Sequence, residues 1–374
     1  MIPREVYTET LLQFLAPVRH FLDDASVSEV MINGPGHVYI ERKGRIENTG
    51  VRFDTRESIM CALRNAAQFV GKHVDELHPI LEARLPDGSR LQAVIPPAAP
   101  DGPYVSIRRF SQDMFTLARL IDGGSLTQDA AETLRVLVSA KLNVMIAGGT
   151  GSGKTSLLNM LTNFIPDTDR VIVIEDSKEV QVQRQHVCYL EARPPDPQNR
   201  GAVTIRDLFR SSLRMRPDRI IIGEIRGGEA LDIVQAMVSG HGGCMGTLHA
   251  TYPRDTLTRL ETMAMMSDVE IPLVALRLQI ASGVNVIVQV ARLQDGTRKV
   301  THITEVTGFD TETGKYQLCD IFVRKYSGVD ANGRILSEFV PSGRLPTFQH
   351  QLAEHGLDLP KAIYDAAERG AEPS

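Results

Sequence analysis

The stretch Gly148-Gly149-Thr150-Gly151-Ser152-Gly153-Lys154-Thr155 decides the fold of this chain. It reads G-x-x-x-x-G-K-T, the spacing of a P-loop that holds a nucleoside triphosphate. The glycines let backbone N–H groups close around the phosphates, Lys154 is expected to reach the β- and γ-phosphate oxygens, and the Thr155 hydroxyl is expected to ligate Mg²⁺. We include the next residue, Ser156, in the predicted nucleotide-binding set.

The residues on either side of this loop supply the context that a P-loop requires. Val144-Met145-Ile146-Ala147 is a short apolar run typical of a buried strand, and residues 156–161 have helical character. Strand, loop and helix follow one another in that order, and the start of the helix adds a partial positive charge beside the phosphates. This order favours a phosphate-binding loop over a glycine-rich turn with a chance lysine.

The composition indicates an ordinary globular chain of two or three domains. Its 374 residues are 42% hydrophobic and 23% charged, with a formal net charge of −5. No basic tract stands out, which disfavours nucleic acid as a partner. No run of 18 apolar residues occurs and the first residues lack a signal peptide, so we expect a cytoplasmic protein without a transmembrane segment. The four cysteines contain no C-x-x-C pair.

Two changes of pattern along the chain predict two domains and a linker. Residues 1–112 read as a small α/β domain, because helical spacing gives way to short strands separated by Gly and Pro turns. Residues 113–125, which include Gly123-Gly124, are the expected hinge linker. From 126 to 374 helical and strand patterns alternate at first, which is typical of a parallel sheet. The expected fold class is therefore α/β, with a P-loop core and a smaller N-terminal domain.

Polar residues follow four apolar strand candidates of the second domain, at the point where each strand ends. They are Lys154, Glu175, Glu224 and His249. In open parallel sheets, ligands bind at the carboxyl ends of the strands. The sequence therefore predicts one site assembled from four separated segments.

Carboxylates end two of these strands. Ile220-Ile221-Ile222-Gly223-Glu224 resembles a Walker B strand in which glycine replaces the usual first carboxylate. A carboxylate beside Mg²⁺ is suited to hold the metal or to orient the attacking water, and we assign these roles to Glu224. For Glu175 the roles of general base, metal support and structural partner of an arginine all remain open. Asp176 is expected to support the site rather than to act directly.

Two histidines and a group of arginines complete the candidates. His249, after the fourth strand, is expected to sense the γ-phosphate through a hydrogen bond, whereas His241 in a glycine-rich turn is a weaker candidate. Arg206, Arg210 and Arg214 recur every four residues and therefore share one helix face, which favours a solvated or salt-bridged surface over a catalytic one.

Taken together, these motifs resemble the secretion-type ATPases of the type II/type IV superfamily. Four boxes of that superfamily match in order, namely Walker A at 148–155, the aspartate box at 174–179, Walker B at 216–230 and the histidine box at 243–250. The resemblance extends upstream to 84–90 and 105–110. It implies a RecA-like core with a PAS-like N-terminal domain, a homohexameric ring and ATP as the nucleotide. It also implies that Arg90 and Arg108 contact the nucleotide phosphates from the N-terminal domain.

Within the superfamily the chain looks most similar to the CpaF-like ATPases of Tad/Flp pili. Residues 304–309, 320–323 and 339–343 resemble the C-terminal part of that group, and the tetracysteine module of general secretion ATPases is missing. The resemblance implies work at the cytoplasmic face of the inner membrane, with platform proteins as partners and pilin as an indirect one. Conjugation-type ATPases of type IV secretion systems also lack the zinc module and remain an alternative.

The function expected from the sequence is a Mg²⁺-dependent ATPase motor for Tad/Flp-type pilus assembly, or for secretion, and whether a pilus motor would extend, retract or do both is left open by the sequence. A nucleic-acid translocase on the same core is a less favoured alternative because the chain is acidic and lacks a basic tract. A small-molecule kinase is a third, for which no acceptor pocket or lid is evident.

Overall fold

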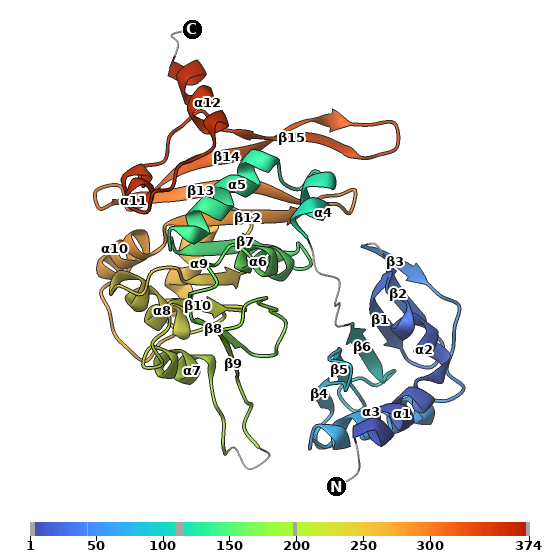
Figure 1. Cartoon of the computed structure of the whole chain (residues 1–374). Helices are drawn as coiled ribbons and strands as arrows, with labels where there is room; N and C mark the ends of the chain where they lie inside the picture. The colour runs from blue at the N-terminus through green and yellow to red at the C-terminus, as the bar shows by residue number, and fades with distance from the viewer. Residues whose placement is uncertain (1–3, 43, 110–115, 197–199, 372–374) are drawn as a thin grey trace. The chain divides into compact units, whose positions relative to one another are not determined.

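The chain divides into two compact units, Met1–Asp113 and Met114–Ser374. The computed structural model describes residues 4–42, 44–109, 116–196 and 200–371, and each unit is described here by itself (Figure 1). The expected linker 113–125 falls partly outside the described residues. Within its described part, Leu117–Asp122 forms helix α4.

Unit 1 is a six-stranded antiparallel sheet with helices. The strand order is β3-β2-β1-β6-β5-β4, so the first and last hairpins lie at opposite edges and β1 pairs with β6 in the middle. Its elements are α1 Arg4–Phe14, α2 Ala16–Asp23, β1 Val27–Asn33, β2 Val38–Arg42, β3 Arg45–Asn48, α3 Arg56–Phe69, β4 Ile80–Arg84, β5 Arg90–Val94 and β6 Tyr104–Arg108.

The core of unit 1 lies between one face of this sheet and the helices. Residues along β5 and β6 alternate between buried and more exposed, which is the two-residue period of a strand with a single buried face. Helix α3 begins where the Thr55 hydroxyl accepts a hydrogen bond from the Ser58 N–H at 3.2 Å. Its buried face, with Ile59 and Leu63, joins the same cluster as Leu91 and Ile107 of the sheet. The opposite sheet face therefore remains available for polar side chains.

Unit 2 is built on a nine-stranded mixed sheet of order β15-β14-β13-β12-β7-β11-β10-β8-β9. Besides α4, its elements are α5 Gln128–Ser139, β7 Val144–Gly148, α6 Lys154–Thr162, β8 Val171–Glu175, β9 Val187–Glu191, α7 Ile205–Ser212, β10 Arg219–Ile222, α8 Glu229–Val238, β11 Met245–Leu248, α9 Pro253–Ala264, α10 Leu273–Gly283, β12 Val286–Arg292, β13 Arg298–Asp310, β14 Lys315–Val329, β15 Ile335–Pro341, α11 Gln349–Glu354 and α12 Lys361–Ala371.

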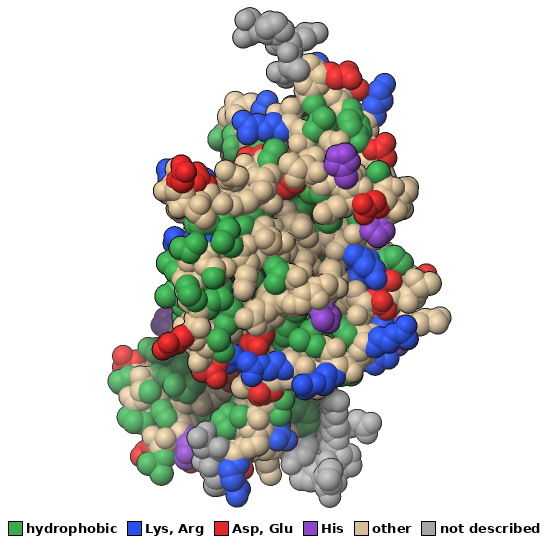
Figure 2. All heavy atoms as spheres, turned by 90° about the vertical axis from the view of Figure 1, so that its left-hand side faces the viewer, with side chains coloured by type: hydrophobic (Ala, Val, Ile, Leu, Met, Phe, Trp, Pro, Cys, Tyr) green, Lys and Arg blue, Asp and Glu red, His purple; other side chains and the backbone are tan. Residues whose placement is uncertain are grey.

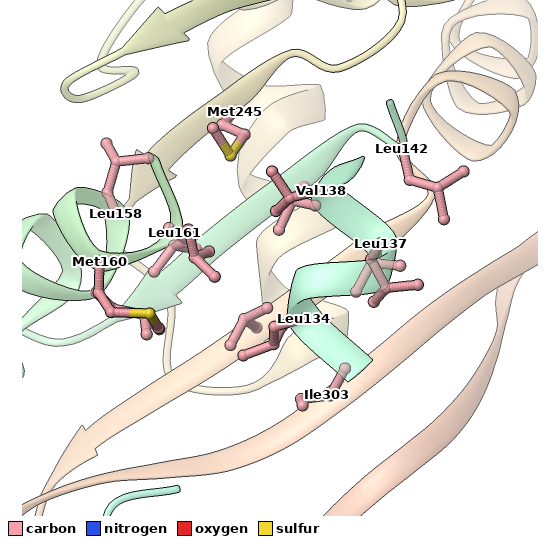
Figure 3. Close-up of a cluster of buried hydrophobic side chains, with 14 of the residues drawn as sticks. Leu134, Leu137, Val138, Leu142, Leu158, Met160, Leu161, Met245 and Ile303 are labelled. Atoms are coloured by element: carbon pink, nitrogen blue, oxygen red, sulfur yellow. The ribbon is translucent and has the colours of Figure 1, made fainter. Parts of the chain in front are cut away.

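The parallel half of this sheet is buried on both faces. Every residue of β7, β8, β10 and β11 is buried, as expected for parallel strands covered by helices on each side. On one face α5 and α6 pack onto the sheet, and Figure 3 shows Leu134, Leu161 and Ile303 in this cluster. On the other face α7 to α10 form a second cluster. The carboxyl ends of four adjacent parallel strands are thus fixed at one edge.

The antiparallel half, β12 to β15, extends the sheet and fastens the start of unit 2. The buried Arg324 on β14 donates to the carbonyl oxygen of Ser125 at 2.8 Å, and Lys299 on β13 donates to that of Gly123 at 2.6 Å. The residues between α4 and α5 are therefore held against β13 and β14. Among the residues that the structure describes, no helix combines the length and the hydropathy needed to cross a bilayer.

Candidate nucleotide-binding site

The loop between β7 and α6 has the shape of a phosphate-binding loop. A Cβ atom on Gly148 would lie 2.4 Å from the carbonyl oxygen of Val290 and 2.5 Å from the Ser152 hydroxyl, so only glycine fits there. Gly153 has a φ of 97°, in the left-handed region that glycine adopts without strain, and the helix begins at the next residue. The glycines at these two positions are therefore structural requirements of the loop.

Lys154 places its ammonium group at this loop. The side chain is buried, and its Nζ donates to the carbonyl oxygens of Gly148 and Gly149, each at 3.1 Å. Thr155 and Ser156 follow in the first turn of α6, where helix N–H groups and the helix dipole favour an anion. The loop, its lysine and the helix start thus have the geometry of a phosphate-binding loop, and phosphate binding by these residues stays a prediction.

Strand order brings the predicted residues together. Because β11 lies between β7 and β10, His249 sits between the P-loop and the end of β10. The two ring nitrogens of His249 are each 3.4 Å from Lys154 Nζ, and its Nε2 is 3.2 Å from Glu224 Oε1. Three residues far apart in sequence thus form one chain of polar contacts.

Glu224 is an ionised carboxylate held by a second residue. Burial by itself would raise the pKa of Glu224, but the hydrogen bond from Arg226 and the nearby positive charges outweigh it and lower the pKa. Arg226 donates to Glu224 at 2.6 Å and pairs with Asp176 at 3.1 Å. Burial and the charge of Lys154 lower the pKa of His249, so its ring is neutral at pH 7.

Glu175 occupies the space beside Gly223. A Cβ atom on Gly223 would lie 2.7 Å from Glu175 Cγ and 2.8 Å from its Oε1. Oε1 also accepts backbone hydrogen bonds from Glu179 at 3.0 Å and Val180 at 2.9 Å. Burial raises the pKa of Glu175 to about 7, although these two bonds act against the shift. A buried glutamate from β8 therefore lies where a Walker B aspartate would project from β10.

The predicted magnesium ligands are oxygen donors. The Thr155 hydroxyl and the carboxylate of Glu224 are the ligand type that Mg²⁺ prefers, and the nucleotide would supply further oxygens. In the described part of the chain, no group of three His, Cys, Asp or Glu side chains is arranged to hold a metal by itself. The donor set fits a nucleotide-bound Mg²⁺.

The other candidates in unit 2 lie outside this chain of contacts. Arg206 and Arg210 both bind Asp232, with Nε–Oδ distances of 2.6 and 2.8 Å, and Arg206 also pairs with Asp268. These two arginines therefore form part of a salt-bridged helix face, as expected. His241 lies in the loop after α8, where its backbone N–H donates to Ala236.

Arg90 and Arg108 are neighbours in unit 1. In the strand register Arg90 lies opposite Arg108 on one side and Arg84 on the other, and Arg108 lies opposite Glu29. All three arginines project from the sheet face opposite the core. Like charges at directly opposed positions repel one another, and the position of Glu29 opposite Arg108 offsets part of this repulsion. Arg90 also pairs with Glu82 at 3.7 Å.

Two arginines that neighbour or contact the candidate residues, Arg84 and Arg226, were not predicted from the sequence. Arg84 lies within the matched segment 84–90, and only the strand register shows that it extends the row of Arg90 and Arg108. Arg226 follows the Walker B glutamate by two positions, a spacing that predicts no role. Its importance is evident only from its ion pairs with Glu224 and Asp176.

The P-loop, the parallel strand order and the residues at the strand ends define a RecA-like P-loop protein. The chain belongs to the family of type II/IV secretion system proteins, whose family model matches residues 12–335.

Its relatives agree with this assignment. A putative conjugal transfer protein of Mycobacterium tuberculosis is 32% identical over 282 residues, which cover 74% of this chain and 80% of that protein. The type IV secretion system protein PtlH of Bordetella pertussis is 32% identical over 330 residues, covering 80% and 95%. The solved structure of the ATPase DotB of Legionella pneumophila is similar in fold, with a TM-score of 0.53, 19% identity and coverage of 81% and 82%.

Proposed function

We propose that this protein is a Mg²⁺-dependent ATPase that works as a homohexameric motor of a type IV secretion or conjugation machine. The observation that carries the proposal is the chain of contacts from Lys154 through His249 to Glu224. It joins the lysine proposed to bind phosphate to a carboxylate suited to orient the attacking water. The relatives named for conjugal transfer and type IV secretion support this assignment.

Motor activity for Tad/Flp pilus assembly is the second candidate. The stretches 304–309, 320–323 and 339–343 favour it, and they lie in or next to β13, β14 and β15. Both assignments place the protein at the cytoplasmic face of the inner membrane, beside integral membrane proteins of the machine. Nucleic-acid translocation is less favoured. On the face drawn in Figure 2 acidic and basic side chains are interspersed rather than gathered into one basic stripe.

In the proposed reaction, the P-loop binds and positions the phosphates while Lys154 neutralises their charge. Bound Mg²⁺ would supply further neutralisation and would be held by Thr155 and Glu224 together with phosphate oxygens. Glu224 is ionised and half-buried, and its carboxylate would accept the hydrogen bond that orients the attacking water. We assign Glu175 to support of the metal end of the site, because it fills the position of a Walker B acid.

His249 is the proposed sensor of the γ-phosphate. Its neutral ring already contacts both Lys154 and Glu224. A phosphate oxygen arriving at Lys154 would compete for the same hydrogen-bonding groups, so His249 is placed to exchange partners when ATP binds and again when phosphate leaves. Through this exchange of hydrogen-bond partners, the position of His249 at the end of β11 would depend on which nucleotide is bound.

Arg90 and Arg108 are the proposed source of positive charge for the transferring phosphoryl group. Dissociative phosphoryl transfer places negative charge on equatorial oxygens, and arginines supplied by another domain or subunit stabilise it. The row of like charges in unit 1 fits such a role, because an anion would offset the local repulsion. We assign the same role to Arg84, because it lies opposite Arg90 in the strand register.

The proposal is tested by the specific ATPase rate with Mg²⁺ as a function of protein concentration, with Glu224→Gln as the blank. A rate per subunit that rises steeply and then saturates is expected, because assembly completes the site. A rate that stays constant down to concentrations where the protein is monomeric would contradict the ring motor. Absence of Mg²⁺-dependent hydrolysis at every concentration would contradict the ATPase itself.

A further inference from the structure

Gln289 is a buried polar side chain beside the candidate site, and none of the roles described above involves it. It lies on β12 and is 2% exposed. Its amide donates from Nε2 to the carbonyl oxygens of Ala250 and Thr251, at 3.0 and 3.1 Å. Both acceptors belong to the segment 249–252, which joins β11 to α9 and begins with His249. All these residues belong to unit 2, so the contact does not depend on how the two units are placed.

The strand register explains how a side chain of β12 reaches the segment after β11. In the sheet β7 lies between these two strands. Gln289 is paired with Ala147 of β7, and Ala147 is paired with Leu248 of β11. The residue between the two outer strands is thus an alanine, whose single methyl group leaves room for a longer neighbouring side chain. The hydrogen bonds of Gln289 therefore connect β12, across β7, to the backbone that follows β11.

The hydrogen bonds also fix the orientation of the Gln289 amide. Carbonyl oxygens only accept hydrogen bonds, so the NH₂ group must face Ala250 and Thr251. The amide oxygen Oε1 is buried and has no hydrogen-bond partner among the residues that the structure describes. A buried acceptor without a partner is destabilising, and an apolar side chain of similar size would avoid this cost. Stability of the strand alone therefore does not account for a glutamine at this position.

The segment that Gln289 holds carries His249, whose contacts require a defined position. The ring nitrogens of His249 lie 3.4 Å from Lys154 Nζ, and Nε2 lies 3.2 Å from Glu224 Oε1. His249 and Ala250 are only partly buried and Thr251 is exposed, so packing restrains this segment weakly. The bonds from Gln289 anchor the backbone one and two residues after His249, and their loss would allow the ring to move away from both partners.

We propose that Gln289 is a positioning residue of the ATPase site, which holds the backbone of 250–251 so that His249 stays between Lys154 and Glu224. The proposal rests on the function proposed above, because Gln289 acts through the proposed γ-phosphate sensor. It assigns to Gln289 no contact with the nucleotide. Loss of the amide should therefore slow turnover and leave nucleotide binding by the P-loop almost unchanged.

The first part of the test measures the segment itself in the full chain, without nucleotide. Gln289→Met keeps the length of the side chain and removes both N–H donors together with the unpartnered oxygen, so the fold should persist. The order parameter of the Ala250 Cα–Cβ axis, from NMR relaxation of its ¹³C-labelled methyl group, should fall from about 0.85 to below about 0.6. Ala230, which is fully buried on α8, is the internal reference and should keep its value.

The second part of the test measures turnover. Gln289→Met should lower kcat for ATP by roughly 10- to 100-fold, because a displaced His249 no longer contacts the reacting groups, and should leave KM within about threefold. In a His249→Ala background the same substitution should cause no further loss, since Gln289 acts through that histidine. Thr301→Val on β13 is the matched control. Thr301 is also buried, but its hydroxyl donates to the backbone carbonyl of Gln289 at 3.4 Å, so the amide stays in place and kcat should be unchanged.

Other outcomes separate this proposal from the proposed function. An unchanged order parameter at Ala250 would overturn the positioning role, and so would additive losses of Gln289→Met and His249→Ala in the double variant. Gln289→Leu, which also lacks the donors, repeats both measurements if Gln289→Met does not fold. If the wild-type chain hydrolyses no ATP, the proposed function fails together with the catalytic part of this proposal. Loss of order at Ala250 would then still show that Gln289 holds the segment.

Discussion

The two sets of charged residues proposed for catalysis are held in opposite ways. In unit 2, Lys154, His249, Glu224 and Arg226 contact one another in sequence, with opposite charges adjacent at the glutamate. In unit 1, arginines occupy three successive positions across β4, β5 and β6. The first arrangement places opposite charges side by side, whereas the second places like charges side by side, and Glu82 and Glu29 offset only part of a repulsion that a bound anion would relieve further. It follows that opposite charges stabilise one set in the free protein, whereas the other set would gain stability from a bound anion.

The strongest test of this comparison is Arg108→Ala. We expect turnover to fall by roughly 10³-fold, as when an arginine finger is lost, because negative charge on the transferring group is no longer offset. The thermal stability of the protein should change little, because the substitution removes a repulsive neighbour of Arg90 and also the attraction between Arg108 and the opposed Glu29. Steady-state ATPase assays and calorimetry measure the two effects. Arg45→Ala, on the exposed strand β3, is the control, and unchanged turnover in Arg108→Ala would remove its assigned role.

The second test addresses the chain of contacts in unit 2 that runs from Lys154 through His249 to Glu224. Glu224→Gln keeps the shape of the side chain but removes its charge, so ATP should still bind while turnover falls by roughly 10²- to 10³-fold. Nucleotide binding and single-turnover hydrolysis separate the two effects. Glu338→Gln on β15 is a matched exposed control. Wild-type-like hydrolysis in Glu224→Gln would refute the assignment.

A third test uses the pH dependence of stability in the free protein. Folding raises the pKa of Glu175 from 4.5 to about 7, so between these values the folded state binds more protons than the unfolded state. The contribution of this group to stability is therefore most favourable below pH 4.5 and is lost as the pH rises towards 7, by roughly 3 kcal/mol in total. Glu175→Gln should remove this slope in denaturant unfolding measured from pH 5 to 8. A slope identical to that of the wild type would show that Glu175 is not protonated on folding.

The smallest effect is expected from Gly223→Ala. The added methyl group would overlap Glu175 Cγ at 2.7 Å, and relief by small shifts should leave a loss of about 1–3 kcal/mol in the free energy of unfolding. In a double-mutant cycle Glu175→Ala should recover most of this loss. Gly36→Ala, whose new methyl group meets nothing within 4 Å, is the control. Additive losses in the double mutant would show that the two side chains do not share this space.

The sequence predicted the parts of the site that local pattern controls. The P-loop follows from glycine spacing, and the meeting of Lys154, Glu224 and His249 follows from parallel strands that end at one edge. The order of those strands did not follow, because β11 enters between β7 and β10 by a crossover that spacing does not encode. The contacts of Arg226 and the register that places Arg84 beside Arg90 also depend on pairing between distant segments. Pairing of this kind produces no recognisable pattern in a single sequence.

The close approach of Glu175 to Gly223 has a consequence for how such sites are recognised. A single volume beside the P-loop accommodates one carboxylate, and either of two neighbouring strands is able to provide it. In this chain β8 provides the acid, Glu175. Gly223 follows β10, and a side chain there would overlap Glu175. A search for an aspartate in the usual position of the Walker B strand would therefore find the motif broken, although a carboxyl group from the adjacent strand fills the same space.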